Sequence, residues 1–226
     1  MNLRDSRASQ LERIGLEQMP HEGLEAENLH LWRGEHHVLN GVGFALPRGT
    51  CLHVAGANGS GKTTLLRTVC GLLYAESGRV LWDGEDVQAD LPAFHARLIY
   101  IGHEPPLKTD LSALENLGYW VGVRRRAGRA LLRAALERVG AAACADRPVR
   151  TLSAGQKRRV ALAALSLLAA PLWLLDEPTT NLDTEGQRLV GALIEEQLAR
   201  GGLVVAATHQ ELPVARERLR RLELAA

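Results

Sequence analysis

The stretch that most constrains the fold of this chain is the glycine-rich run Gly56-Ala-Asn-Gly-Ser-Gly-Lys-Thr63, which matches the pattern G-x-x-x-x-G-K-[ST]. A short apolar run over residues 51–55 precedes it and predicts a strand. Apolar residues at helical spacing follow it over residues 64–70. Strand, glycine loop and helix in this order are the context in which the pattern forms a phosphate-binding loop. The sequence therefore predicts an α/β protein that binds a nucleotide.

The chemistry of this run follows from its residue types. Glycines tolerate positive φ, so successive backbone N–H groups can turn toward one anion, and the helix that begins near Gly61 adds its N-terminal donors. Lys62 supplies a point charge for the β- and γ-phosphates, and the Thr63 hydroxyl is a candidate Mg²⁺ ligand. The predicted nucleotide-binding residues are Gly56, Ala57, Asn58, Gly59, Ser60, Gly61, Lys62, Thr63 and Thr64.

Composition limits the partners. The chain has 27 basic and 26 acidic side chains among 226 residues, whereas nucleic-acid-binding domains are usually basic, so we predict no nucleic-acid partner. Its three cysteines are far apart and are expected to be buried thiols. Residues 1–23 lack the apolar segment of a signal peptide and are expected to form an extension. The longest uncharged run, residues 160–175, is shorter than the ~20 residues that cross a bilayer. Any membrane role is therefore expected to need a partner.

The segments around the loop predict two further parts of the fold, an antiparallel sheet and a helical subdomain. Residues 24–31 and 38–46 are strand-like and predict an antiparallel sheet ahead of the loop. Residues 79–83 predict another strand, and Asp83-Gly84 is typical of a hairpin turn. Residues 99–101 predict a buried strand, and helical spacing begins at Ser112. We assign residues 88–158, approximately, to an inserted, mainly helical subdomain. Its basic run, residues 124–126, is interpreted as a solvated connector, with phosphate contact as the alternative.

A second motif completes the expected chemistry. The run Leu172-Trp-Leu-Leu-Asp-Glu177 is an apolar strand that ends in two carboxylates. Asp176, at the strand end, is predicted to hold Mg²⁺ together with Thr63, directly or through water. Glu177 points in a different direction and suits the polarisation of a water molecule that attacks the γ-phosphate. This pair predicts hydrolysis in addition to binding.

The run Leu152-Ser-Ala-Gly-Gln-Lys-Arg-Arg159, just before that strand, resembles the signature sequence of ABC-type ATPases. Ser153 is a good N-cap for a helix that we expect to run to Ala170. The resemblance implies a Mg²⁺-dependent ATP hydrolase with ATP as its nucleotide. It also implies a RecA-like P-loop NTPase core over residues 24–226, with an N-terminal antiparallel β subdomain and an inserted helical subdomain. In that family the signature residues, here Ser153, Gly155 and Gln156, close on the γ-phosphate held by a second copy, so a homodimer with two ATP molecules is expected.

Two more stretches match the same family. Thr179-Thr-Asn-Leu-Asp183 is similar to the D-loop, which in that family crosses the dimer interface. His209 follows an apolar strand over residues 203–208 and matches the switch histidine that senses the γ-phosphate. The resemblance thus implies Glu177 and His209 as the catalytic residues.

Four positions depart from the family pattern. Ala57 replaces a common proline and keeps its N–H, and Ala154 replaces the third signature residue. Arg33 stands where an aromatic residue usually stacks on adenine, while Trp32 lies one position away. Trp32 either stacks on the adenine or packs locally. His103 replaces the glutamine of the Q-loop. Because oxygen ligands suit Mg²⁺ better than imidazole, we expect His103 to couple to a partner rather than to contact the metal.

Within the family, three variants resemble the ATP-binding subunits of the cytochrome c maturation system: Tyr100-Ile-Gly-His103 with residues 107–117, the signature run, and Ala207-Thr-His-Gln210. The resemblance implies a peripheral protein on the cytoplasmic face of a bacterial inner membrane. Integral membrane subunits would be contacted through residues 103–117, and ATP hydrolysis would drive haem export or release of a haem-loaded chaperone. No direct haem contact is predicted, because the chain has no C-x-x-C-H motif. The alternatives are an ABC importer or exporter subunit for another cargo, a soluble ABC switch protein, and an inactive nucleotide-binding regulator.

Overall fold

The computed structural model describes residues 22–224, which form two sheets with helices around them. The antiparallel sheet has the order β2-β1-β4-β5, from β1 (Gly23–Arg33), β2 (His36–Pro47), β4 (Ser77–Trp82) and β5 (Glu85–Asp86). The second sheet has the order β6-β7-β8-β3-β9, and its neighbouring strands are parallel. Its strands are β3 (Cys51–Ala55), β6 (Leu98–Ile101), β7 (Leu172–Asp176), β8 (Leu203–Ala207) and β9 (Leu219–Glu223). The predicted α/β P-loop fold is confirmed.

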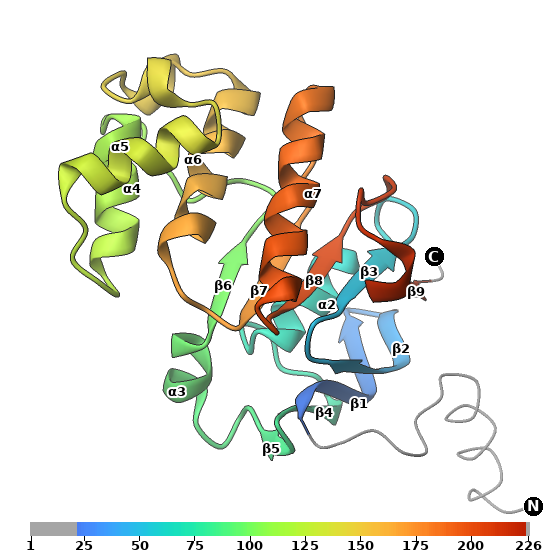
Figure 1. Cartoon of the computed structure of the whole chain (residues 1–226). Helices are drawn as coiled ribbons and strands as arrows, with labels where there is room; N and C mark the ends of the chain where they lie inside the picture. The colour runs from blue at the N-terminus through green and yellow to red at the C-terminus, as the bar shows by residue number, and fades with distance from the viewer. Residues whose placement is uncertain (1–21, 225–226) are drawn as a thin grey trace, which may run out of the picture.

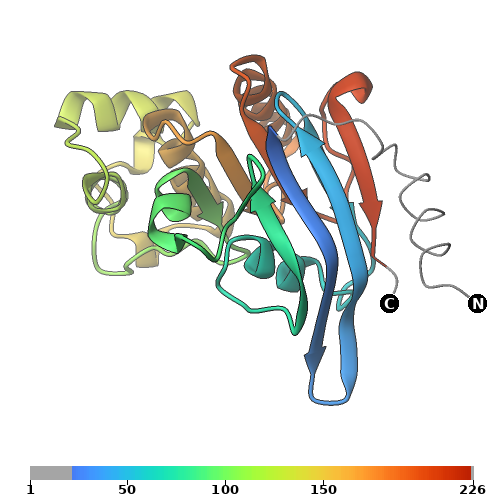
Figure 2. The same cartoon turned by 90° about the horizontal axis from the view of Figure 1, so that it is seen from below.

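The helices divide between the two sides of the parallel sheet. They are α2 (Lys62–Val69), α3 (Leu91–Ala96), α4 (Ala113–Gly122), α5 (Arg129–Arg138), α6 (Ala154–Leu167) and α7 (Thr184–Ala199), with short 3-10 turns at Ala142–Cys144, Val149–Thr151 and Arg216–Arg218. Helices α4, α5 and α6 gather on one side of the molecule, and the antiparallel sheet lies on the opposite side (Figure 1). Figure 2 shows the same separation from below.

The parallel sheet is buried on both faces because alternate residues of its strands enter two different apolar clusters. In β7, Leu172 and Leu174 pack with α2 and the antiparallel sheet, whereas Trp173 and Leu175 pack with α4 to α7. The three cysteines are buried within these clusters, as expected. Because parallel strands end at one edge, this packing brings the ends of β3, β7 and β8 together.

The hairpin between β4 and β5 forms at the predicted turn. Asp83 and Gly84 have φ of 51° and 82°, and Trp82 pairs with Glu85 across them. Two successive residues with positive φ match the right-handed twist of the strands they connect.

Several boundaries differ from those expected from the sequence. Residues 98–101 lie within the segment assigned to the helical subdomain, yet they form β6 of the parallel sheet. The helix after the signature ends at Leu167, because Leu168 is already extended, with φ of −102° and ψ of 116°. Strand β9 was not anticipated, since its sequence is rich in exposed arginine. It forms because β3 supplies a parallel partner along its whole length.

The proposed N-terminal extension, residues 1–23, lies outside the described residues except for its last two, and Gly23 already belongs to β1. Among residues 22–224, none of the helices combines the length and the apolar character that crossing a membrane requires.

Candidate functional site

The phosphate loop connects the end of β3 to the start of α2, as the motif predicts. Its glycines Gly56, Gly59 and Gly61 have φ of 146°, 87° and 95°, values that side-chain-bearing residues rarely adopt. A Cβ atom at Gly56 would lie 2.5 Å from the Ser60 hydroxyl and 2.7 Å from the Leu224 carbonyl oxygen. At Gly61 it would lie 2.8 Å from a methyl group of Val38. The loop is therefore pressed between the end of β9 and strand β2.

Polar groups in this loop fit a phosphate chain. The Ser60 hydroxyl is buried and has no partner within the described residues. The Lys62 ammonium donates to the carbonyl oxygens of Gly56 and Ala57, at 2.8 and 2.9 Å, so it is folded back over the loop. A cation above a ring of N–H donors at a helix N-terminus matches the charge of a di- or triphosphate.

Thr63 and Asp176 meet at the edge of the parallel sheet. The Thr63 hydroxyl donates to the Asp176 carboxylate at 2.8 Å, and Asp176 is 1% exposed. Burial raises the pKa of the Asp176 carboxyl above its ordinary value, while the Thr63 bond and the nearby His103 ring oppose that shift. A hydroxyl and a carboxylate oxygen side by side are ligands that Mg²⁺ prefers. The two residues thus fit the metal position predicted for them.

Glu177 lies directly after β7 in a constrained backbone conformation. Its φ is 49°, a left-handed value that costs a non-glycine residue about 1–3 kcal/mol unless its surroundings hold it there. The Glu177 N–H donates to the Ala207 carbonyl oxygen at 2.8 Å. Its carboxylate accepts the Thr208 hydroxyl at 2.9 Å and the Thr180 hydroxyl at 3.3 Å. Its other oxygen lies 3.2 Å from Nδ1 of His209. The structure therefore brings together the two residues that were predicted to be catalytic.

The signature residues lie at the start of α6. Ser153 and Gln156 form a capping box, in which the Ser153 hydroxyl accepts the Gln156 N–H and the Gln156 side chain accepts the Ser153 N–H. A Cβ atom on Gly155 would lie 2.5 Å from the Asn181 carbonyl oxygen, so this glycine allows close contact with the D-loop. None of the hydrogen bonds described for residues 22–224 joins Ser153, Gly155 or Gln156 to the phosphate loop. The hydrogen bonds described for Ser153 and Gln156 lie within the start of α6 itself.

One residue of the signature helix has a role that the sequence did not reveal. Arg158 is 2% exposed, and its guanidinium donates to the carbonyl oxygens of Gly102, at 3.0 Å, and of His103. Burial lowers its pKa, an effect that the negative charges of Asp176 and Glu177 oppose. Arg158 thus links α6 to the turn that carries His103. The available signal was its spacing of four and seven residues from the apolar Leu162 and Leu165, which places it on the buried face of α6.

Trp32 packs locally. Its ring stacks on that of His37, with a centroid separation of 3.8 Å and an interplanar angle of 7°. His37 in turn lies 3.0 Å from His30, measured between ring nitrogens. One face of the Trp32 ring is therefore covered by a residue of the neighbouring strand.

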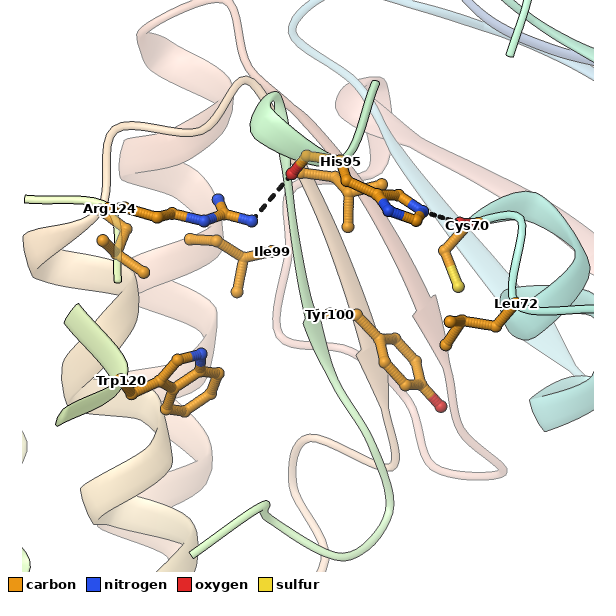
Figure 3. A pocket seen from close by; sticks show the side chains of 9 residues that line it. Cys70, Leu72, His95, Ile99, Tyr100, Trp120 and Arg124 are labelled. Atoms are coloured by element: carbon orange, nitrogen blue, oxygen red, sulfur yellow. Dashed lines mark hydrogen bonds between the residues drawn. The ribbon is translucent and has the colours of Figure 1, made fainter. Parts of the chain in front are cut away.

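A separate cavity of about 250 Å³ lies among the end of α2, strand β6 and helix α4 (Figure 3). Its lining includes Tyr100, Trp120, Arg124 and His95. Nε2 of His95 lies 2.8 Å from the Cys70 carbonyl oxygen, and Arg124 donates to the His95 carbonyl oxygen at 2.8 Å. Arg125 donates to the Leu167 carbonyl oxygen at 3.1 Å. Two of the three arginines expected in a solvated connector are thus anchored to the backbone of other segments.

Comparison with known proteins agrees with this geometry. The family model described as ABC transporter matches residues 39–180. The chain belongs to the ABC transporter family. The cytochrome c biogenesis ATP-binding export protein CcmA 2 of Salmonella paratyphi A is 44% identical over 201 residues, which cover 89% of this chain and 96% of that protein. The CcmA protein of Escherichia coli K12 is 42% identical over the same shares of the two chains.

Solved structures of ABC ATPases show the same fold. An ABC transporter ATP-binding protein from Pyrococcus furiosus, described as putative in its own name, superposes with a TM-score of 0.76 at 24% identity, covering 90% of this chain and 98% of that one. A dimeric ATP-binding cassette in a post-hydrolysis state, bound to ADP and Pi, superposes with a TM-score of 0.72 at 25% identity, covering 83% and 88%. The family and the fold together identify this ABC protein as an ATP-hydrolysing subunit.

Proposed function

We propose that this ABC ATPase powers the haem-export or haem-chaperone release step of cytochrome c maturation, as a subunit of a membrane complex. The relatives named as cytochrome c biogenesis ATP-binding export proteins support this cargo, since they align over 96% of their length. The observation that carries hydrolysis is the contact between Glu177 and His209, held beside the Thr63–Asp176 pair.

In this proposal each residue at the sheet edge has one task. The N–H groups of residues 56–64 and the Lys62 ammonium bind the phosphates of ATP. Thr63 and Asp176 hold Mg²⁺, which when bound neutralises the charge that develops on the phosphate oxygens. Glu177 orients the attacking water and accepts its proton, while His209 donates toward the γ-phosphate. The bonds from Thr208 and Thr180 keep the Glu177 carboxylate in one orientation before ATP arrives.

The second half of the site is proposed to come from a second copy of the chain. Ser153, Gly155 and Gln156 lie at the N-terminus of α6, and the hydrogen bonds described for them do not reach the phosphate loop of their own chain. Such a helix N-terminus attracts anions. The dimeric relative in the ADP- and Pi-bound state supports this arrangement. Closure would place the signature of one protomer on the γ-phosphate held by the other.

Transmission to the membrane subunits is proposed to pass through residues 103–117. Arg158 ties the start of this segment to α6, and α4 begins within it at the capped residue Ser112. A movement of α6 on dimer closure would therefore move His103. The protein would accordingly lie on the cytoplasmic face of the bacterial inner membrane through its partners, without contacting haem itself.

The experiment uses Glu177→Gln in the intact membrane complex. We expect ATP to remain bound, turnover to fall by about 10²–10⁴, the usual contribution of a general base, and the dimer to stay closed. A haem-loaded chaperone should accumulate in the membrane fraction, measured by its haem absorbance. Native turnover in this variant would contradict the assignment of Glu177. Loss of turnover with normal haem-chaperone release would instead favour another cargo, and assembly without membrane subunits would favour a soluble switch protein.

A further inference from the structure

His53 is a buried titratable residue to which the proposed chemistry gives no task. It lies in β3, three residues before the phosphate loop, and is 4% exposed. β3 lies between β8 and β9, so the ring is enclosed by the parallel sheet and its covering layer. Burying an imidazole destabilises the folded protein unless the ring forms a hydrogen bond. The hydrogen-bond partner of His53 should therefore indicate the role of this residue.

That partner is the backbone beside the catalytic carboxylate. Nε2 of His53 lies 3.0 Å from the Thr208 carbonyl oxygen, and the contact is buried. A carbonyl oxygen only accepts, so Nε2 carries the hydrogen and the tautomer of the ring is fixed. Thr208 is 0% exposed and follows the last residue of β8. Within the described residues, His53 is the hydrogen-bond donor that satisfies this carbonyl oxygen.

Thr208 is thereby held at each of its polar groups. Its N–H donates to the Val54 carbonyl oxygen at 3.1 Å, and its hydroxyl donates to the Glu177 carboxylate at 2.9 Å. Because the peptide unit is planar, a fixed Thr208 carbonyl also fixes the N–H of His209 and the direction in which that residue leaves the strand. One imidazole thus determines the orientation of the peptide that joins Thr208 to His209.

We propose that His53 is a positioning residue for ATP hydrolysis, which acts through Thr208 to aim both the Glu177 carboxylate and the His209 ring at the γ-phosphate. The inference rests on the proposed catalytic roles of Glu177 and His209. The hydrogen bond described for the His53 side chain goes to the Thr208 backbone and not to the phosphate loop. Replacement of His53 should therefore change the rate of the chemical step and leave binding intact.

The test compares two variants of the full-length protein. His53→Leu removes the donor in a similar volume, whereas His53→Gln keeps an amide N–H that can reach the same oxygen. We expect His53→Leu to lower kcat about 10- to 100-fold, as small misplacements of catalytic groups do, with KM and ATP affinity unchanged. His53→Gln should recover most of the native kcat. If the leucine variant does not fold, His53→Asn replaces it, because its shorter amide does not reach Thr208.

A matched control separates positioning from stability. Gln197 is also buried and donates to backbone carbonyl oxygens, those of Ala170 and Pro171 at 2.8 and 3.2 Å, beside the start of β7 and away from Asp176. Gln197→Met should lower Tm about as much as His53→Leu and leave kcat at the native value. Equal losses of kcat in these two variants would overturn the proposal, as would a glutamine variant no faster than the leucine or asparagine variant.

The double variant His53→Leu/Glu177→Gln tests whether His53 acts on hydrolysis through the Glu177 carboxylate. If His53 acts through the Glu177 carboxylate, its replacement should slow the residual turnover of Glu177→Gln far less than it slows the native enzyme, because the two effects are not additive. Native turnover in Glu177→Gln alone would mean that the catalytic assignment fails. Slow turnover in Glu177→Gln together with native kcat in His53→Leu would mean that only the role of His53 fails.

Discussion

At the scale of single residues, Asp176, the proposed Mg²⁺ ligand, is expected to lower the stability of the folded protein near neutral pH. Its carboxyl is 1% exposed and has a raised pKa, because burial disfavours the charged form. A raised folded-state pKa means that the folded protein binds more protons than the unfolded chain. The stability from this group is therefore fully present below the ordinary pKa of 3.8 and is lost as pH rises through the folded-state pKa.

We therefore expect Asp176→Asn to stabilise the protein without nucleotide or Mg²⁺ at neutral pH, although it removes the metal ligand and turnover. The asparagine carbonyl can still accept the Thr63 hydroxyl, so the local contact survives. Thermal unfolding from pH 4 to pH 8 measures the effect, and the gain in Tm should grow with pH and then level off. If Asp176→Asn were less stable than the native protein at pH 8, the buried carboxylate would not be destabilising the folded state. The control is a repeat with saturating Mg²⁺ and ATP, which should reverse the order.

At the scale of elements, we propose that Ser153, at the N-terminus of α6, has both a structural and a chemical role. As an N-cap its hydroxyl accepts the Gln156 N–H at 3.2 Å, and in the proposed dimer it also meets the partner's nucleotide. Ser153→Ala should lower the free energy of unfolding by ~1 kcal/mol and reduce turnover. Ser153→Asp caps equally well, so its unfolding free energy should stay near the native value, while its charge repels the γ-phosphate and abolishes turnover. Urea unfolding and ATPase assays together separate the two tasks. If the aspartate variant were as active as the native protein, Ser153 would have no contact with phosphate.

Sequence patterns predicted features with local signals and missed contacts between distant segments. The Thr63–Asp176 pair was predictable because the loop and the strand each have a recognisable pattern, and parallel strands end at one edge. The N-cap role of Ser153 was predictable for a similar reason, since its signal is local. Arg158 and His53 were not found, because the sequence around a polar residue does not reveal which distant backbone carbonyl its side chain meets. Strand β9 escaped because its pairing with β3 is non-local and its own residues are largely polar.

At the scale of the whole molecule, the proposed contact between the signature of one chain and the nucleotide of a second copy means that a complete site would contain two chains. In a symmetric dimer each site takes residues 56–64 from one protomer and Ser153 from the other, so the two sites are identical and cross-connected. A defect in Lys62 and a defect in Ser153 carried on different protomers therefore fall in the same site. The other site is then made entirely from native parts.

This geometry predicts complementation between two inactive variants. Lys62→Ala removes the ammonium that folds over the loop and should weaken ATP binding, whereas Ser153→Asp should bind ATP and not turn it over. Co-expression with two different tags and sequential capture yields heterodimers only. If the sites act independently, each heterodimer should show about half of the native turnover, since one of its two symmetric sites is intact. Homodimers of either variant are the controls and should be inactive. Inactive heterodimers would mean either that hydrolysis needs two intact sites at once or that Ser153 acts in the site of its own chain. A heterodimer of the Lys62→Ala chain with a native chain distinguishes these two explanations. It should hydrolyse ATP only if Ser153 acts in the site of its own chain.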